Sequence, residues 1–179
     1  MVILYYYDCM MIDVILFLFL ICSIYTDIAQ RRIYNATVFP IMAVGVMLNV
    51  FYSGAGGLKD SAGGIAGGFL FLCLFYLSGG MGAGDVKFMM AVGALKGFSF
   101  MAVGGLYGAL VGGIAALCVL IIKRQALATV KDIGARLFAF SLLRDKRLLQ
   151  FDESKAEKLP YAAFLSCGML LHFYELYFL

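Results

Sequence analysis

Apolar residues run along the chain in long stretches, and short polar segments separate them. About 20 mostly apolar residues cross the hydrocarbon core of a bilayer as an α-helix, and somewhat fewer suffice in short or tilted helices. The pattern therefore predicts an all-α, polytopic membrane protein with a single membrane-embedded domain over residues 1–179. Its six predicted membrane-spanning helices lie at about 9–26, 36–52, 61–78, 86–97, 98–122 and 159–178.

Composition excludes the soluble and disordered classes of protein. Hydrophobic residues make up 64% of the 179 residues, charged residues make up 14%, and the mean hydropathy is +0.96. Soluble domains contain about 45–50% apolar residues, and disordered chains contain far fewer. The first apolar stretch lacks the basic start and small-residue cleavage site of a secretory signal peptide, so we expect it to be retained as a span.

The basic residues predict the orientation in the membrane. Nine of the fourteen Lys and Arg residues fall in the segment 123–158, and Arg31, Arg32 and Lys87 lie on the same face in the six-span arrangement. Loops rich in Lys and Arg stay on the cytoplasmic side. We therefore expect a multi-pass protein of the inner (cytoplasmic) membrane with both termini outside. The basic loop would carry an amphipathic helix near 130–143 against anionic lipid headgroups. The net charge of +3 is too small to indicate a nucleic-acid partner.

Glycines recur at four-residue spacing in two of the predicted spans. Small side chains at this spacing let helices approach closely in lipid. Neither the Rossmann nor the P-loop pattern is met, so the glycines predict helix packing rather than nucleotide binding. They are Gly64, Gly68, Gly104, Gly108 and Gly112, together with their glycine neighbours.

Two carboxylates stand at the predicted cytoplasmic ends of apolar spans and at matched depth. Asp27 closes the first span, and Asp85 begins the fourth, after a turn with glycines at 80, 82 and 84. Ionisable groups at membrane depth are costly and mark functional sites. Taken singly, each has a simpler interpretation: Asp85 as a helix cap, and Asp27 as a partner of Arg31 one turn later. Neither interpretation explains two carboxylates at one depth.

Paired carboxylates suit general acid–base cleavage of a peptide. Two carboxylates about 3 Å apart do not both ionise easily, so they share a proton near neutral pH. One then activates a water molecule, and the other protonates the leaving amine. Glycines at 82 and 84 leave room for an extended peptide beside Asp85. The chemistry needs no metal or cofactor, and the five scattered cysteines form no C-x-x-C pair.

Three motifs together resemble the type IV prepilin peptidase family of membrane aspartic proteases. The first is Asp27 ahead of Arg-Arg-Ile-Tyr-Asn at 31–35, and the second is Gly-Ala-Gly-Asp-Val-Lys at 82–87. The third is Leu-Pro-Tyr-Ala-Ala-Phe at 159–164, which is similar to the start of the family's last span. Tyr34 stands where the family has proline, and Ala162 and Ala163 stand where it has Gly-Pro. We expect these departures to alter loop shape without touching the carboxylates.

The resemblance implies an aspartic endopeptidase that removes a short basic leader from a prepilin at the cytoplasmic face, with membrane lipid as its surroundings. Asp27 and Asp85 would be the catalytic pair, and Gly82, Gly84, Lys87 and Asn35 would support the site. Lys87 would meet either developing negative charge or lipid headgroups. No metal or cofactor is expected. The chain lacks the cysteine-bearing extension that accompanies pilin methylation, which points to the short Flp/Tad-type enzymes.

Other functions remain open at this stage. Archaeal preflagellin peptidases are close relatives of the short form. A small membrane carrier would use the paired carboxylates to bind a cation or proton, although the chain shows no internal repeat. A non-catalytic scaffold of a secretion assembly would need no carboxylate pair. The single histidine, His172, is expected to form a local helix pair with Glu175 rather than part of the site.

Overall fold

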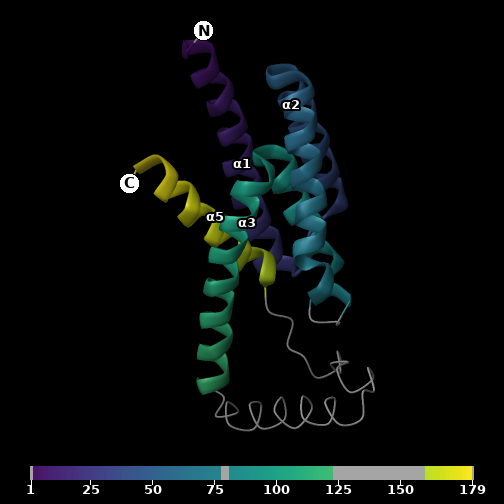
Figure 1. Cartoon of the computed structure of the whole chain (residues 1–179). Helices are drawn as coiled ribbons and strands as arrows, with labels where there is room; N and C mark the ends of the chain where they lie inside the picture. The colour runs from purple at the N-terminus through teal and green to yellow at the C-terminus, as the bar shows by residue number, and fades with distance from the viewer. Residues whose placement is uncertain (1, 78–80, 123–159, 179) are drawn as a thin grey trace, which may run out of the picture.

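The computed structural model describes residues 2–77, 81–122 and 160–178, and this part of the chain is helical. Figure 1 shows four helices and no strand among these residues, which confirms the all-α prediction. The predicted basic loop at 123–158 and its amphipathic helix at 130–143 lie outside the described residues. The helices are α1 (Val2–Gln30), α2 (Asn35–Leu77), α3 (Ala83–Ile122) and α5 (Tyr161–Phe178).

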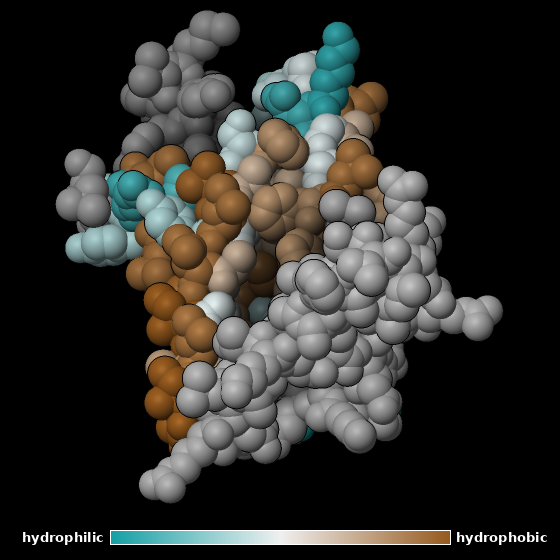
Figure 2. Space-filling model, turned by 60° about the horizontal axis from the view of Figure 1, so that its bottom comes forward, coloured by the Kyte–Doolittle hydropathy of each residue, from teal (hydrophilic) through white to brown (hydrophobic). Residues whose placement is uncertain are grey.

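The surface of the helices is that of a membrane protein. Three helices of the described chain are long and apolar enough to cross a membrane: α1 over Met10–Gln30, α2 over Asn35–Leu77 and α3 over Ala83–Val119. Many large apolar side chains are exposed, among them Phe51 at 81%. Figure 2 shows apolar side chains over much of the coloured surface on one face. A soluble monomer rarely exposes contiguous apolar surface on this scale.

Both long helices are interrupted at a glycine. Gly54 in α2 has φ 57° and ψ −132°, and Gly97 in α3 has φ 78° and ψ 179°. L-residues with a side chain rarely adopt such angles, so glycine is the residue that permits the break. Helix α2 is therefore two helical segments, 35–53 and 55–77, and α3 is likewise 83–96 and 98–122.

The contacts of α2 with α3 show that the chain reverses direction at Gly54. The segment 55–77 packs on 83–96 with their backbones almost touching: a Cβ added to Gly64 would lie 2.0 Å from the carbonyl oxygen of Gly93. Gly68 meets Met89 in the same way, while Gly45 meets Ala94. Residue 45, before the break, and residue 64, after it, thus lie at one level of α3.

The chain also reverses at Gly97. Gly105, eight residues after the break, packs on Met89, eight residues before it. The segment 98–122 then runs antiparallel to α5, because Gly104 meets Met169 and Gly108 meets Leu165. Six helical segments result, and they follow the order of the six predicted apolar stretches. The predicted boundary at residues 97 and 98 coincides with the observed break.

The buried core surrounds the first segment of α3. Phe88, Met89, Val92 and Leu95 are all fully or almost fully buried. They pack against apolar side chains of α1, α2 and α5, among which Leu16 is fully buried. This segment begins at Ala83, two residues before Asp85, so the core fixes the position of one of the two predicted carboxylates.

Candidate active site

Asp27 lies near the end of α1 with its side chain turned into the protein, where it is 6% exposed. The helix ends at Gln30 because Arg31 adopts a left-handed conformation, with φ 51°, and donates its N–H to the Asp27 carbonyl oxygen at 2.8 Å. The Asp27 carboxylate is a separate acceptor. Its Oδ2 accepts a hydrogen bond from the backbone N–H of Ala163 at 2.9 Å, and the N–H of Ala162 also donates to the carboxylate.

Asp27 thereby caps a helix from which it is distant in sequence. The first N–H groups of α5 have no partner within their own helix, and Pro160, which precedes the helix, has no side-chain oxygen to supply one. The carboxylate of Asp27 takes that place and sits at the positive end of the helix dipole. The expectation that Ala162 and Ala163 leave the carboxylates untouched is therefore wrong. A proline at 163 would have no N–H to donate.

Asp85 is the third residue of α3 and is 8% exposed. Its Oδ2 accepts a hydrogen bond from the backbone N–H of Gly82 at 3.2 Å, and its own N–H donates to the Gly82 carbonyl at 3.2 Å. This reach back to the residue before the helix is the geometry of a capping box. The expectation that Asp85 is the N-cap residue is therefore wrong in its position: Gly82 stands at the N-cap, and Asp85 caps the helix start from its third residue.

Both carboxylates lie in the region where α1, α3 and α5 come together. Asp85 lies close enough to Asp27 for the charge of Asp27 to act on it. Tyr161, the first residue of α5, is half-buried and lies within reach of the Asp85 charge. Arg31 acts on Asp27 from the exposed side of the site. Two buried acidic groups from segments 58 residues apart thus share one end of the helix bundle.

The glycines before Asp85 stand in a confined space. A Cβ added to Gly84 would lie 3.3 Å from the Cβ of Ile33, which is tighter than ordinary packing. At Gly82 an added Cβ would contact Oδ2 of Asp85 at 3.5 Å. The missing side chain at Gly84 therefore lets the loop between α1 and α2 approach the start of α3.

Lys87 and Asn35, both predicted to support the site, contact each other. The Lys87 Nζ donates to Oδ1 of Asn35 at 3.0 Å and lies 5.7 Å from the centre of the Phe39 ring. Asn35 is the first residue of α2, and Lys87 lies two residues beyond Asp85. The contact therefore links the first residue of α2 to the beginning of α3, near Asp85.

Sequence reasoning missed the backbone donors of the site. Ala162 and Ala163 carry no polar side chain, so no motif search marks them. The available signal was the absence of a capping residue at the start of the last helix, directly after Pro160. Elsewhere, the expected pair of His172 with Glu175 is confirmed, with Nδ1 and Oε2 3.3 Å apart. Among the described residues, no group of three or more His, Cys, Asp or Glu is placed to hold a metal ion.

Comparisons with known proteins agree with the resemblance seen in the motifs. Curated proteins and solved structures give no significant match to the chain. The model of the type IV leader peptidase family matches residues 14–117, which is more than half of the chain and includes both Asp27 and Asp85. Together with the all-helical fold and the apolar surface, this match means that the chain is a membrane peptidase that belongs to the type IV leader peptidase family.

Proposed function

We propose that the protein is an aspartic endopeptidase in which Asp27 and Asp85 are the catalytic pair. The observation that carries the proposal is that these two buried carboxylates, from α1 and α3, lie at one end of the bundle, with Asp85 within range of the Asp27 charge. Burying even one ionisable group in a membrane protein is costly, so two buried carboxylates at one place favour a common function. Capping one helix each would not require that they meet.

In the proposed reaction the carboxylates share one proton. The charged carboxylate takes a proton from water, and the oxygen of that water forms a bond to the peptide carbonyl carbon. The other carboxyl gives its proton to the reacting peptide, the C–N bond breaks, and the leaving nitrogen departs as an amine. Backbone N–H groups of Gly82 and Ala163 hold the carboxylates in place. These donors do not titrate, so they orient the pair without competing for its proton.

We infer six membrane crossings from the two reversals. Helices α2 and α3 each turn back at a glycine, at Gly54 and Gly97, so each would cross twice, and α1 and α5 once each. Asp27 and Asp85 then face the same side as Arg31 and Arg32. The positive-inside rule makes that side cytoplasmic. A cytoplasmic face is what the proposed location in the inner (cytoplasmic) membrane requires.

The proposed substrate is a prepilin of the Flp type with a short basic leader before its apolar helix. The family match supports a prepilin-type substrate in general, and the Flp class is the finer part of the proposal. A cut next to an apolar helix requires a site at the membrane surface, which is where the proposed topology puts both carboxylates. An extended peptide would lie beside Gly82, which is exposed and next to Asp85, whereas Ile33 already occupies the space beside Gly84. The contact of Lys87 with Asn35 would keep the surrounding loop in position.

Co-expression with a candidate Flp prepilin tests the proposal. The substrate should become shorter on a gel only when the peptidase is present, and N-terminal sequencing should place the cut between the basic leader and the apolar helix. A prepilin that stays full length, although both proteins are inserted in the membrane, would contradict the proposed substrate. Cleavage within the apolar helix or in the pilin domain would contradict the proposed position of the site.

A further inference from the structure

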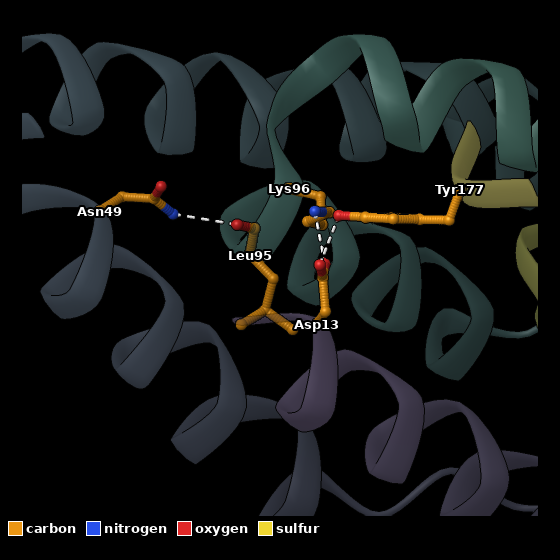
Figure 3. Close-up of polar contacts among 5 residues, drawn as sticks. All are labelled: Asp13, Asn49, Leu95, Lys96 and Tyr177. Carbon is orange, nitrogen blue, oxygen red and sulfur yellow. Dashed lines mark hydrogen bonds and ion pairs between the residues drawn. The ribbon is translucent and has the colours of Figure 1, made fainter. Parts of the chain in front are cut away.

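A second cluster of charged and polar side chains lies away from Asp27 and Asp85, in the middle of α1 and next to the Gly97 break of α3. Figure 3 shows Asp13 of α1 facing Lys96 of α3 and Tyr177 of α5. The Lys96 Nζ lies 2.5 Å from Oδ1 of Asp13, and the Tyr177 hydroxyl donates to Oδ2. The Lys96 and Asp13 side chains are only 12% and 10% exposed. The cluster joins three helices next to the break at Gly97.

Its depth places the cluster inside the membrane. Asp13 and Asp27 are fourteen residues apart on α1, which is about 21 Å along a helix that rises 1.5 Å per residue. Lys96 and Asp85 are eleven residues apart on α3, or about 17 Å. A hydrocarbon core is about 30 Å thick. With the aspartates at one membrane surface, the ion pair therefore falls short of the other surface.

The helices beside the cluster continue past it with apolar, exposed flanks. Gly45 of α2 lies at the level of Ala94, and α2 goes on for nine residues, about 13 Å, before it turns at Gly54. Met47 and Phe51, within this extension, are 66% and 81% exposed. Lipid-facing surface thus extends above the level of the ion pair. The break in α3 is therefore recessed within the membrane, below the tip of α2.

A pocket of about 470 Å³ lies beside the recessed break. Its lining is rich in polar side chains, and the Gly97 backbone forms part of it. Residues of α1, α2 and α3 all contribute to the lining. They are Ile12, Asn49, Tyr52, Ser53, Lys59, Asp60, Gly63, Leu95, Lys96, Gly97, Phe98 and Ser99.

The last carbonyl groups before the break at Gly97 need hydrogen-bond partners from outside their own helical segment. The carbonyls of Ala94 and Leu95 accept from the Asn49 Nδ2, at 3.0 Å each (Figure 3 draws the Leu95 bond), and the Ser61 hydroxyl also donates to Ala94 at 2.9 Å. These bonds satisfy the end of the first segment of α3. Non-helical backbone at membrane depth is otherwise tolerated only inside protein or along a water-filled cavity.

We propose that this pocket is an aqueous vestibule, open on the face opposite the aspartates, that admits water and small hydrophilic solutes to the depth of the ion pair. Its floor is the Gly97 turn with Lys96, which pairs with Asp13, and its wall is the α2 hairpin. The vestibule ends there, because the fully buried apolar residues Phe88 and Val92 fill α3 between the floor and Asp85. Water for hydrolysis therefore reaches the aspartates from the other face. The proposal rests on the six-crossing arrangement proposed above and modifies it in one respect: segments 83–96 and 98–122 meet at Gly97 inside the membrane, and the vestibule, not helix, spans the remaining depth.

Thiol labelling tests the vestibule. Ser99, an exposed pocket residue, is changed to cysteine, and Met47→Cys is the matched control at a similar level on the lipid-facing side of α2. Intact cells are treated with a membrane-impermeant, charged methanethiosulfonate, and label above that of the parent chain is measured. Thiols react as thiolates, which form in water and not in lipid. Ser99→Cys should be labelled, and Met47→Cys should stay at background.

Three results would overturn the proposal. If the labelling of Ser99→Cys stays at background in both intact cells and inside-out vesicles, the pocket contains no water. Labelling of Ser99→Cys only in inside-out vesicles would mean that the pocket opens on the other face. Equal labelling of Met47→Cys would mean that this level lies outside the membrane. None of these results depends on peptidase activity, so a failure to process prepilin is a separate outcome that bears only on the proposed function.

Discussion

Each of the two buried carboxylates accepts a hydrogen bond at the start of a helix. Asp27 accepts the N–H of Ala163 at the start of α5, and Asp85 accepts the N–H of Gly82 at the start of α3. A helix start attracts negative charge, so both bonds hold the carboxylates in fixed orientations. The cap and the proposed catalytic role are therefore compatible. Capping explains the orientation of each side chain, and the proposed catalysis would explain why both stand at one end of the bundle.

At the scale of the residue, the side chains of the candidate site could be predicted from the sequence, whereas the backbone N–H groups that contact them could not. Asp27 and Asp85 stand out because acidic residues are rare in apolar spans. Asn35 and Lys87 were each predicted to support the site, but nothing in a sequence shows that these two residues, 52 positions apart and on different helices, contact each other. The N–H groups of Ala162 and Ala163 were overlooked because every residue except proline carries one. Only the tertiary structure determines which N–H groups meet a carboxylate.

At the scale of the helix, glycine acts in two distinct ways. At Gly54 and Gly97 it permits backbone angles that reverse the chain. At Gly64 and Gly93 it lets two helices pack with their backbones in contact. The sequence predicted the second role for Gly64 from four-residue spacing but did not predict it for Gly93. It placed the boundary at Gly97 correctly but gave no reason for it, because the left-handed angles are a property of the fold.

Gly97→Ala should destabilise the protein. The angles at Gly97 lie in a region that is nearly exclusive to glycine, and a side chain there costs about 1–3 kcal/mol. Gly113→Ala is the control, since a Cβ at Gly113 meets open space within a regular helix, and it should be neutral or slightly stabilising. Thermal unfolding in one detergent compares the two. Equal Tm values would mean that α3 does not break at Gly97.

The adjacent pair Gly63 and Gly64 tests helix packing at single-residue resolution. A Cβ at Gly64 would lie 2.0 Å from the Gly93 carbonyl oxygen, whereas one at Gly63 meets no atom within 4 Å. Gly64→Ala must push α2 away from α3, and overpacking of this kind costs about 1–3 kcal/mol. Gly63→Ala should leave the Tm unchanged or raise it. The reverse order of the two variants would contradict the packing of α2 on α3.

At the scale of the whole molecule, the apolar pattern was enough to predict an all-helical membrane protein. It also indicated six apolar stretches, which follow the order of the six helical segments in the part of the chain that the structure describes. It could not show that α2 and α3 each contain two of these segments, or that α5 supplies donors to Asp27. Those features depend on contacts between distant parts of the chain, which hydropathy does not encode.

The proposed mechanism predicts that chelators do not change the rate of prepilin processing. Two carboxylates and a water molecule perform every proton transfer, so no metal is required. Prepilin processing in detergent should therefore be equal with and without EDTA. The control is a metallopeptidase assayed in the same buffer, which must lose activity. Loss of prepilin processing on chelation, with recovery on addition of zinc, would contradict an aspartic mechanism.

The account as a whole depends on Asp27 and Asp85 acting as one unit. Asp27→Asn, Asp85→Asn and the double variant are compared for cleavage of a co-expressed prepilin, with insertion in the membrane checked for each. Glu175→Gln, which changes an exposed carboxylate at the far end of α5, is the matched control and should process normally. Members of a catalytic unit fail together, so each single variant should lose processing to the same degree as the double variant. Efficient cleavage by a well-inserted Asp85→Asn variant would contradict the account and leave Asp85 as a helix cap alone.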